Sequence, residues 1–178
     1  YMSNNTPEPS AKYLKDYQSP DYTLNKVDLV FDLSGETTTV EATIDVVRQG
    51  QHERPLVLDG NQLKLLDVSI NGEVVVEQNY HHSGSQLTLL NVPTQFTLKT
   101  VVEIDPANNT SLEGLYEADG CYCTQCEAEG FRHITYFLDR PDVLCKYTTK
   151  IIANKSTHPI LLSNGNNIAS GDLSDSKH

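Results

Sequence analysis

Apolar and polar residues alternate with a period of two along several stretches of the chain. In residues 27–33 apolar side chains occupy every second position, and residues 40–46 repeat this pattern after a Ser34-Gly35 turn. A period of two is typical of a strand that buries one face. We therefore predict two half-buried strands that pair in antiparallel fashion.

Similar signals continue through the rest of the sequence. Asn71-Gly72 separates two apolar stretches and favours the positive φ angles of a type I′ hairpin turn. No window of 12 residues shows a convincing helical period. We predict an all-β fold, a saddle-like structure or sandwich of mostly antiparallel strands with little helix. The further predicted strands are residues 56–58, 63–70, 73–78, 86–90, 95–104, 146–152 and 160–163, the last followed by an Asn164-Gly165 turn.

The two ends of the chain depart from this pattern. Residues 1–20 are polar, contain prolines and lack periodicity, so we expect an N-terminal arm that is partly disordered. Met2 is the only methionine, and we interpret it as the native start, with Tyr1 as an added residue. Residues 171–178 offer no apolar run to close a sheet. We expect residues 21–178 to form one domain that is truncated within a longer polypeptide.

Composition and charge argue against several classes of function. The chain carries 13 Lys and Arg against 24 Asp and Glu, a net charge of −11 without a basic cluster, so we expect no nucleic-acid partner. No stretch approaches the roughly 20 apolar residues of a membrane helix, so we expect no membrane partner. The N-terminus also lacks the basic start and apolar run of a signal peptide. These features predict a cytoplasmic protein.

Four cysteines lie in one quarter of the chain, at Cys121, Cys123, Cys126 and Cys145. A disulfide framework would be spread more widely, so we interpret them as reduced. Cys123 and Cys126 have the Cys-x₂-Cys spacing of a structural zinc site, which another cysteine or His133 would complete. A single pair is only half of a zinc signature, and packing as small hydrophobic residues is the simpler interpretation. Redox catalysis is disfavoured because the nearby carboxylates of Asp119, Glu127 and Glu129 would raise a thiol pKa.

The same segment places Gln125, Glu127 and Glu129 at positions i, i+2 and i+4. In an extended segment these side chains would project from one side and present acceptors to a cationic ligand such as a primary ammonium. An acidic loop in solvent is the alternative that the residues alone leave open.

Longer motifs around this segment carry a family resemblance. The sequence CTQCEAEGFR at residues 123–132, with EGLY at 113–116 and FLDRPDV at 137–143, resembles the N-terminal domain of zinc aminopeptidases of the aminopeptidase N (alanyl aminopeptidase) family, and its bacterial members in particular. The resemblance extends over nearly the whole chain from Ala11 onward. It implies a saddle-shaped β domain that packs on a catalytic domain and closes one side of the active site.

The resemblance also implies roles for individual residues. Gln125 takes the position that lines the pocket for the first side chain of the substrate, and Glu127 takes the position that binds its free α-amino group. The family's His-Glu-x-x-His and Gly-x-Met-Glu-Asn motifs are absent. We therefore expect no catalytic and no metal-binding residue in this fragment, with Zn²⁺ held by the absent catalytic domain. The expected parent is a metallopeptidase, a hydrolase that removes N-terminal amino acids from peptides, and the isolated fragment should be inactive.

A stand-alone β-sandwich binding or interaction module without catalysis is the alternative. The two hypotheses predict different partners: the catalytic domain of the same chain and a peptide with a free N-terminus for the first, and a ligand of the acidic loop 125–129 for the second. They also predict different surfaces. A domain taken from an enzyme should expose the apolar face that met its neighbour, whereas a complete module should not.

Overall fold

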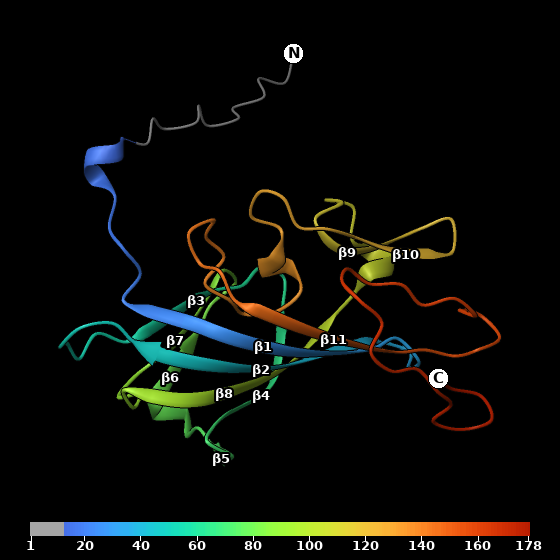
Figure 1. Cartoon of the computed structure of the whole chain (residues 1–178), viewed down its shortest axis with the longest axis horizontal. Helices are drawn as coiled ribbons and strands as arrows, with labels where there is room; N and C mark the ends of the chain where they lie inside the picture. The colour runs from blue at the N-terminus through green and yellow to red at the C-terminus, as the bar shows by residue number, and fades with distance from the viewer. Residues whose placement is uncertain (1–12) are drawn as a thin grey trace.

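The computed structural model describes residues 13–178 of the chain, and within them it contains β-strands and short 3₁₀ helices but no α-helix (Figure 1). The all-β prediction is confirmed. The 3₁₀ helices are η1 (Leu14–Asp16), η2 (Glu77–Asn79), η3 (Pro106–Asn108) and η4 (Phe131–His133). The strands are β1 (Tyr22–Asp32), β2 (Thr38–Arg48), β3 (Leu56–Asp59), β4 (Lys64–Ile70), β5 (Glu73–Val74), β6 (Tyr80–His82), β7 (Gln86–Leu89), β8 (Gln95–Ile104), β9 (Gly114–Ala118), β10 (Cys121–Gln125) and β11 (Lys146–Ile152).

The strands form three sheets. The largest has the order β11-β1-β2-β8-β4-β5, a second has the order β3-β7-β6, and β9 and β10 form a separate hairpin. Neighbouring strands are antiparallel in every pair except β1 and β11, which are parallel. The prediction of mostly antiparallel pairing is therefore confirmed, with one parallel edge.

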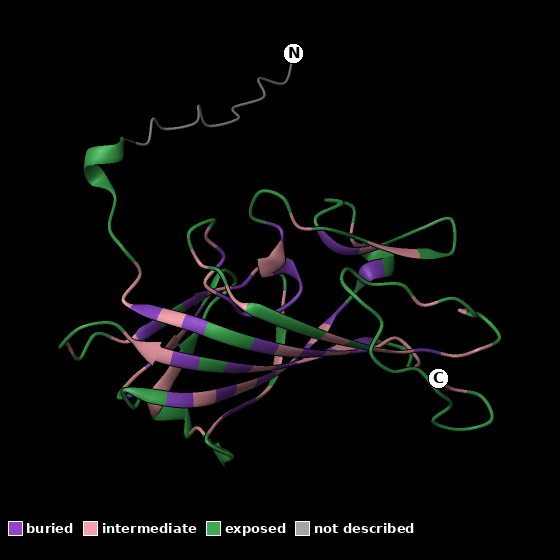
Figure 2. Ribbon diagram, in the orientation of Figure 1, coloured by how far each residue is buried: buried purple, intermediate pink, exposed green. Residues whose placement is uncertain are grey.

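One face of the six-stranded sheet carries most of the core. Burial alternates along β1, β2 and β8, as the bands in Figure 2 show. The three-stranded sheet contributes fully buried leucines to the same cluster, at Leu56, Leu58, Leu87 and Leu89. Each such side chain stabilises the fold by about 1.5–3 kcal/mol on leaving water. The period of two in the sequence thus reflects strands that turn one face to a shared core.

Two of the predicted strands differ from the structure. Asn71 and Gly72 have φ angles of 52° and 84°, as the predicted type I′ turn requires, but β5 then ends at Val74 rather than at residue 78. The strand predicted at residues 160–163 is wrong: this segment has no regular structure, and the Ile160 side chain is 76% exposed. An apolar run forms a strand only where a neighbouring strand can pair with it, and none lies beside this one within the described residues.

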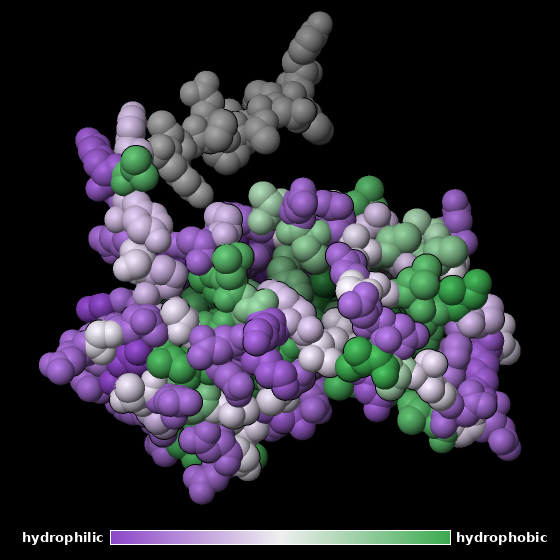
Figure 3. Space-filling model, in the orientation of Figure 1, coloured by the Kyte–Doolittle hydropathy of each residue, from purple (hydrophilic) through white to green (hydrophobic). Residues whose placement is uncertain are grey.

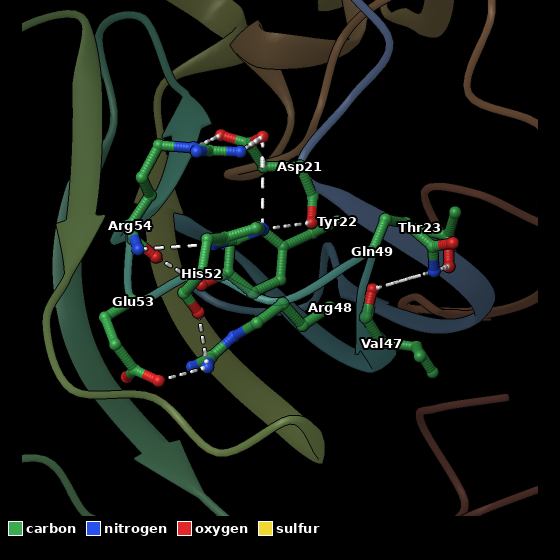
Figure 4. Close-up of polar contacts among 9 residues, drawn as sticks. All are labelled: Asp21, Tyr22, Thr23, Val47, Arg48, Gln49, His52, Glu53 and Arg54. Carbon is green, nitrogen blue, oxygen red and sulfur yellow. Dashed lines mark hydrogen bonds and ion pairs between the residues drawn. The ribbon is translucent and has the colours of Figure 1, made fainter.

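A polar cluster fixes the start of β1 to the end of β2 (Figure 4). The Arg54 guanidinium donates from Nε to the Asp21 carboxylate over 2.7 Å and lowers the pKa of that carboxyl. The half-buried Arg48 donates from Nη1 to the carbonyl oxygen of His52 over 2.7 Å and to Glu53 over 3.2 Å. These bonds anchor the loop between β2 and β3.

Residues 13–20 of the predicted arm lie outside the sheets. Tyr17 donates a hydrogen bond to Asp142 over 2.9 Å, and Arg140 donates to the carbonyl oxygen of Gln18 over 2.8 Å. The first 12 residues of the arm, for which we predicted partial disorder, lie outside the described residues. Between residues 13 and 178 the structure contains no helix long and apolar enough to cross a membrane.

Candidate substrate-binding site

Gln125 is the last residue of a hairpin that the alternation pattern did not predict. β9 and β10 pair from Ala118 and Cys121 to Gly114 and Gln125. They are joined by Asp119 and Gly120, whose φ angles of 51° and 76° fit a type I′ turn. The strands predicted from the sequence do not include this hairpin, so the prediction was incomplete here. The Asp-Gly pair was the signal for it, but the flanking residues do not alternate clearly.

The chain reverses immediately after Gln125. Residues 127–130 form a turn, and the Gly130 N–H donates to the carbonyl oxygen of Cys126 over 2.9 Å. The expected extended geometry, with Gln125, Glu127 and Glu129 on one side, is therefore wrong. The turn nevertheless brings the first two together, since the Gln125 Nε2 atom lies 3.4 Å from the carbonyl oxygen of Glu127 and donates to it.

Both predicted substrate-binding side chains are exposed. Within residues 13–178, the Glu127 carboxylate has no hydrogen bond or ion pair to another side chain. An exposed carboxylate without a protein partner is free to accept a charge-assisted hydrogen bond from an ammonium group. The roles of Gln125 and Glu127 in binding stay predictions at this point.

Gly130 packs closely against the strand end that carries Gln125. A Cβ atom at Gly130 would lie 2.7 Å from the backbone oxygen of Gln125 and 3.0 Å from the Cys126 Cα. The backbone angles of Gly130, φ −88° and ψ −11°, are open to any residue. The space, rather than the conformation, therefore requires glycine here.

Arg132 connects this turn to two other parts of the fold. Its Nε donates to the Asp139 carboxylate over 2.9 Å, and its Nη2 lies 3.3 Å from the Glu129 carboxylate and 4.0 Å from that of Asp59. Burial would lower the pKa of Arg132, but its hydrogen bond to Asp139 and the charges of the three carboxylates outweigh burial and raise it. In the sequence, Asp139 and Arg132 were only members of the family motifs, and their contact was not predicted.

His133 has polar partners other than the cysteines. Its Nε2 lies 3.1 Å from the Glu113 carboxylate and 3.3 Å from the Asn61 side-chain nitrogen, beside a cavity of about 230 Å³. Across residues 13–178, no three His, Cys, Asp or Glu side chains are grouped closely enough to hold a metal ion. The arrangement therefore gives no support to the alternative of a cysteine zinc site.

The four cysteines are free thiols. Burial raises the pKa of Cys126, and the charge of Asp139 adds to this effect. Burial likewise raises the pKa of Cys145. The pKa of Cys126 is raised as expected, but burial is the main cause, and the carboxylate that adds to it is Asp139 and not one of the three named from the sequence. Both side chains pack against the edge of the core.

Comparison with known proteins places these features in a family. Residues 17–178 match the peptidase M1 N-terminal domain. The chain belongs to this family. This M1 N-terminal domain is 51% identical over 173 residues to aminopeptidase N of Escherichia coli and 46% identical to aminopeptidase N of Caulobacter vibrioides, in each case over 97% of the chain. It spans about a fifth of the length of these relatives.

Solved structures agree on the fold of this M1 N-terminal domain. A structure of Legionella pneumophila aminopeptidase A in complex with aspartic acid aligns with 94% of the chain and 20% of its own, at a TM-score of 0.88 and 38% identity. An M1 zinc metallopeptidase of Deinococcus radiodurans aligns with 76% of the chain and 33% of its own, at a TM-score of 0.63 and 16% identity. The second likeness shows a shared fold only.

Proposed function

We propose that this M1 N-terminal domain forms part of a zinc metallo-aminopeptidase that removes N-terminal amino acids from peptides. The identity to two aminopeptidases N over nearly the whole chain supports this proposal. The domain closes one side of the active site and binds the substrate, while the remainder of the enzyme performs the cleavage.

Within this function, Glu127 binds the free α-ammonium group and Gln125 lines the pocket for the first side chain. The observation that carries this assignment is the exposed Glu127 carboxylate, which has no side-chain partner among residues 13–178, in a turn whose backbone carbonyl accepts from the Gln125 amide. A charge-assisted hydrogen bond of roughly 1.5–3 kcal/mol selects free N-termini and fixes the position of the first peptide bond.

We also propose that the zinc ion implied by the family is held by residues outside this chain. In support, residues 13–178 bring together no set of side chains that fits a zinc ion. The contribution of this chain is then to bind and orient the peptide. The free thiols support the cytoplasm, a reducing compartment, as the proposed location.

The catalytic domain is the proposed partner of the apolar face of this chain. Large apolar side chains are exposed along the C-terminal segment, at Ile160, Leu162, Ile168 and Leu173. Apolar groups gather over this segment in Figure 3. Exposed apolar patches of this kind mark surfaces that meet a protein neighbour.

Replacement of Glu127 by Ala in the full-length enzyme tests the assignment. We expect kcat/KM for peptides with a free N-terminus to fall by roughly 10- to 1,000-fold, or about 1.4–4 kcal/mol of transition-state binding. Glu117→Ala serves as the matched control, because Glu117 is an exposed carboxylate on β9 of the same hairpin. An unchanged kcat/KM in Glu127→Ala would remove Glu127 from the binding site.

A further inference from the structure

The turn that carries Glu127 is held at three points. The Gly130 N–H bonds to the carbonyl oxygen of Cys126, and the Gln125 side chain bonds to the carbonyl oxygen of Glu127. The third point is the ion pair between Glu129 and Arg132, whose atoms lie 3.3 Å apart. The first two bonds link the turn to itself and to the end of β10. The ion pair links the turn to η4 through side chains, and the His133 N–H links them through the backbone by donating to the Gly130 carbonyl oxygen over 3.1 Å.

Arg132 is itself fixed firmly in the fold. Its backbone N–H and its Nε both donate to the carboxylate of Asp139, over 3.1 and 2.9 Å, and its Nη2 donates to the Asp139 carbonyl oxygen over 3.1 Å. Its own carbonyl oxygen accepts from the Asn61 N–H over 2.8 Å. Asp139 is buried, so these bonds are shielded from water. Arg132 therefore offers a fixed cation to any carboxylate on the turn.

Glu129 is the more exposed member of the pair. Its side chain is 51% exposed, whereas that of Arg132 is 24% exposed. The contact with Arg132 ties the turn to η4 at a position two residues after Glu127. A planar guanidinium can hold Asp139 and Glu129 at the same time, which a lysine ammonium on a flexible stem does less well.

We propose that Glu129 and Arg132 form a positioning pair that holds the Glu127 carboxylate in place for the α-ammonium group of the substrate. This inference rests on the proposed function, because it assigns Glu129 an effect that acts through Glu127. Small displacements of a binding group weaken the bound geometry, so a second layer of contacts that fixes such a group contributes to affinity.

A double-mutant cycle in the full-length enzyme tests this inference. The variants are Glu129→Ala, Glu127→Ala and the combination of both, with Glu117→Ala as the control for loss of one negative charge on the same hairpin. For a peptide substrate with a free N-terminus, we expect Glu129→Ala to raise KM by about two- to fivefold, the size that a half-exposed ion pair gives, with kcat little changed. In the Glu127→Ala background, the same substitution should have almost no further effect.

Arg132→Lys provides a second test that keeps the positive charge but removes the guanidinium geometry, both toward Glu129 and toward Asp139. We expect the same rise in KM, again absent in the Glu127→Ala background. Thermal unfolding of each variant shows whether the fold has lost stability. The kinetic comparison gives the second criterion, because a purely structural role would lower activity equally with and without Glu127.

Three results would overturn the inference, and they are distinguishable. If Glu127→Ala lowers kcat/KM while Glu129→Ala has no effect, the positioning role is wrong and the proposed function stands. If the effects of the two substitutions multiply, Glu129 acts on the substrate directly or on the whole fold. If Glu127→Ala itself has no effect, the assignment of Glu127 fails and the positioning role fails with it.

Discussion

Gly130 determines how the two predicted binding residues are supported, because the backbone around it leaves no room for a side chain. We expect Gly130→Ala to destabilise the fold by about 1–3 kcal/mol, since its Cβ would lie 2.7 Å from the backbone oxygen of Gln125 and the strand end must move. The displaced Gln125 should also lower kcat/KM in the full-length enzyme. Denaturant unfolding and steady-state kinetics measure the two effects.

The control for this substitution is Gly84→Ala. A Cβ at Gly84 meets no atom within 4 Å, so this change should alter the free energy of unfolding by no more than about 0.5 kcal/mol. Equal stability of the two variants would mean that the turn relaxes freely around Gly130, and the tight contact would then carry no constraint on the site.

The sequence allowed Gln125 and Glu127 to be named, but not the residues that support them. Gln125 and Glu127 belong to a contiguous motif, so a local resemblance was sufficient to select them. The partners of Arg132 include Asp59, which is 73 positions earlier in the chain, and only the folded sheet brings the two together. Charged residues such as Asp59 and Arg132 follow no periodic pattern along the chain, so the sequence does not show which of them pair in the fold and which face solvent.

At the scale of whole elements, the strands that were predicted well are those that bury one of their own faces against the core. β1, β2 and β8 alternate because each contributes every second residue to the same core. β11 was also found, but its parallel pairing with β1 joins residues more than 100 positions apart and left no local signal. The β9–β10 hairpin was missed because it lies outside the two main sheets and its burial does not alternate.

The arm around η1 provides a prediction at this same scale. The hydrogen bonds from the Arg140 guanidinium and from Tyr17 on the arm lower the pKa of Asp142 from its ordinary value of 3.8 to about 2, with Arg140 the larger cause. Because the folded-state pKa is the lower one, ionised Asp142 stabilises the folded chain. This contribution is complete above about pH 4 and is lost as the pH falls through about 2.

We therefore expect Asp142→Asn to lower the free energy of unfolding by about 0.5–1.5 kcal/mol at pH 6, with the deficit shrinking as the pH falls from 4 toward 2. Denaturant unfolding at a series of pH values measures this difference. Asp175→Asn, at an exposed aspartate near the C-terminus, is the control and should show no deficit at any pH. A deficit at Asp142 that stays constant from pH 6 to pH 2 would contradict the assignment.

At the scale of the whole molecule, the chain has one buried apolar face and a second apolar surface that remains open. The side chains of Leu162 and Ile168 are each 84% exposed, in a segment without regular structure. A segment that neither pairs as a strand nor buries its apolar side chains gains little from the fold of this chain alone. Its apolar residues acquire a physical role only if another part of the enzyme covers them.

This reasoning predicts opposite outcomes for one pair of substitutions in two forms of the protein. In the 178-residue chain, Leu162→Ser with Ile168→Ser should change the free energy of unfolding by no more than about 0.5 kcal/mol, because both side chains already contact water. In the full-length enzyme, the same pair of substitutions should destabilise the fold by about 2–5 kcal/mol, because it removes apolar groups from a packed interface.

Denaturant unfolding of both forms provides the measurement, and Asn167→Ser, at an exposed polar residue of the same segment, should be neutral in each. If the full-length enzyme tolerates the pair as well as the isolated chain does, the catalytic domain does not cover this surface and must dock elsewhere on this chain.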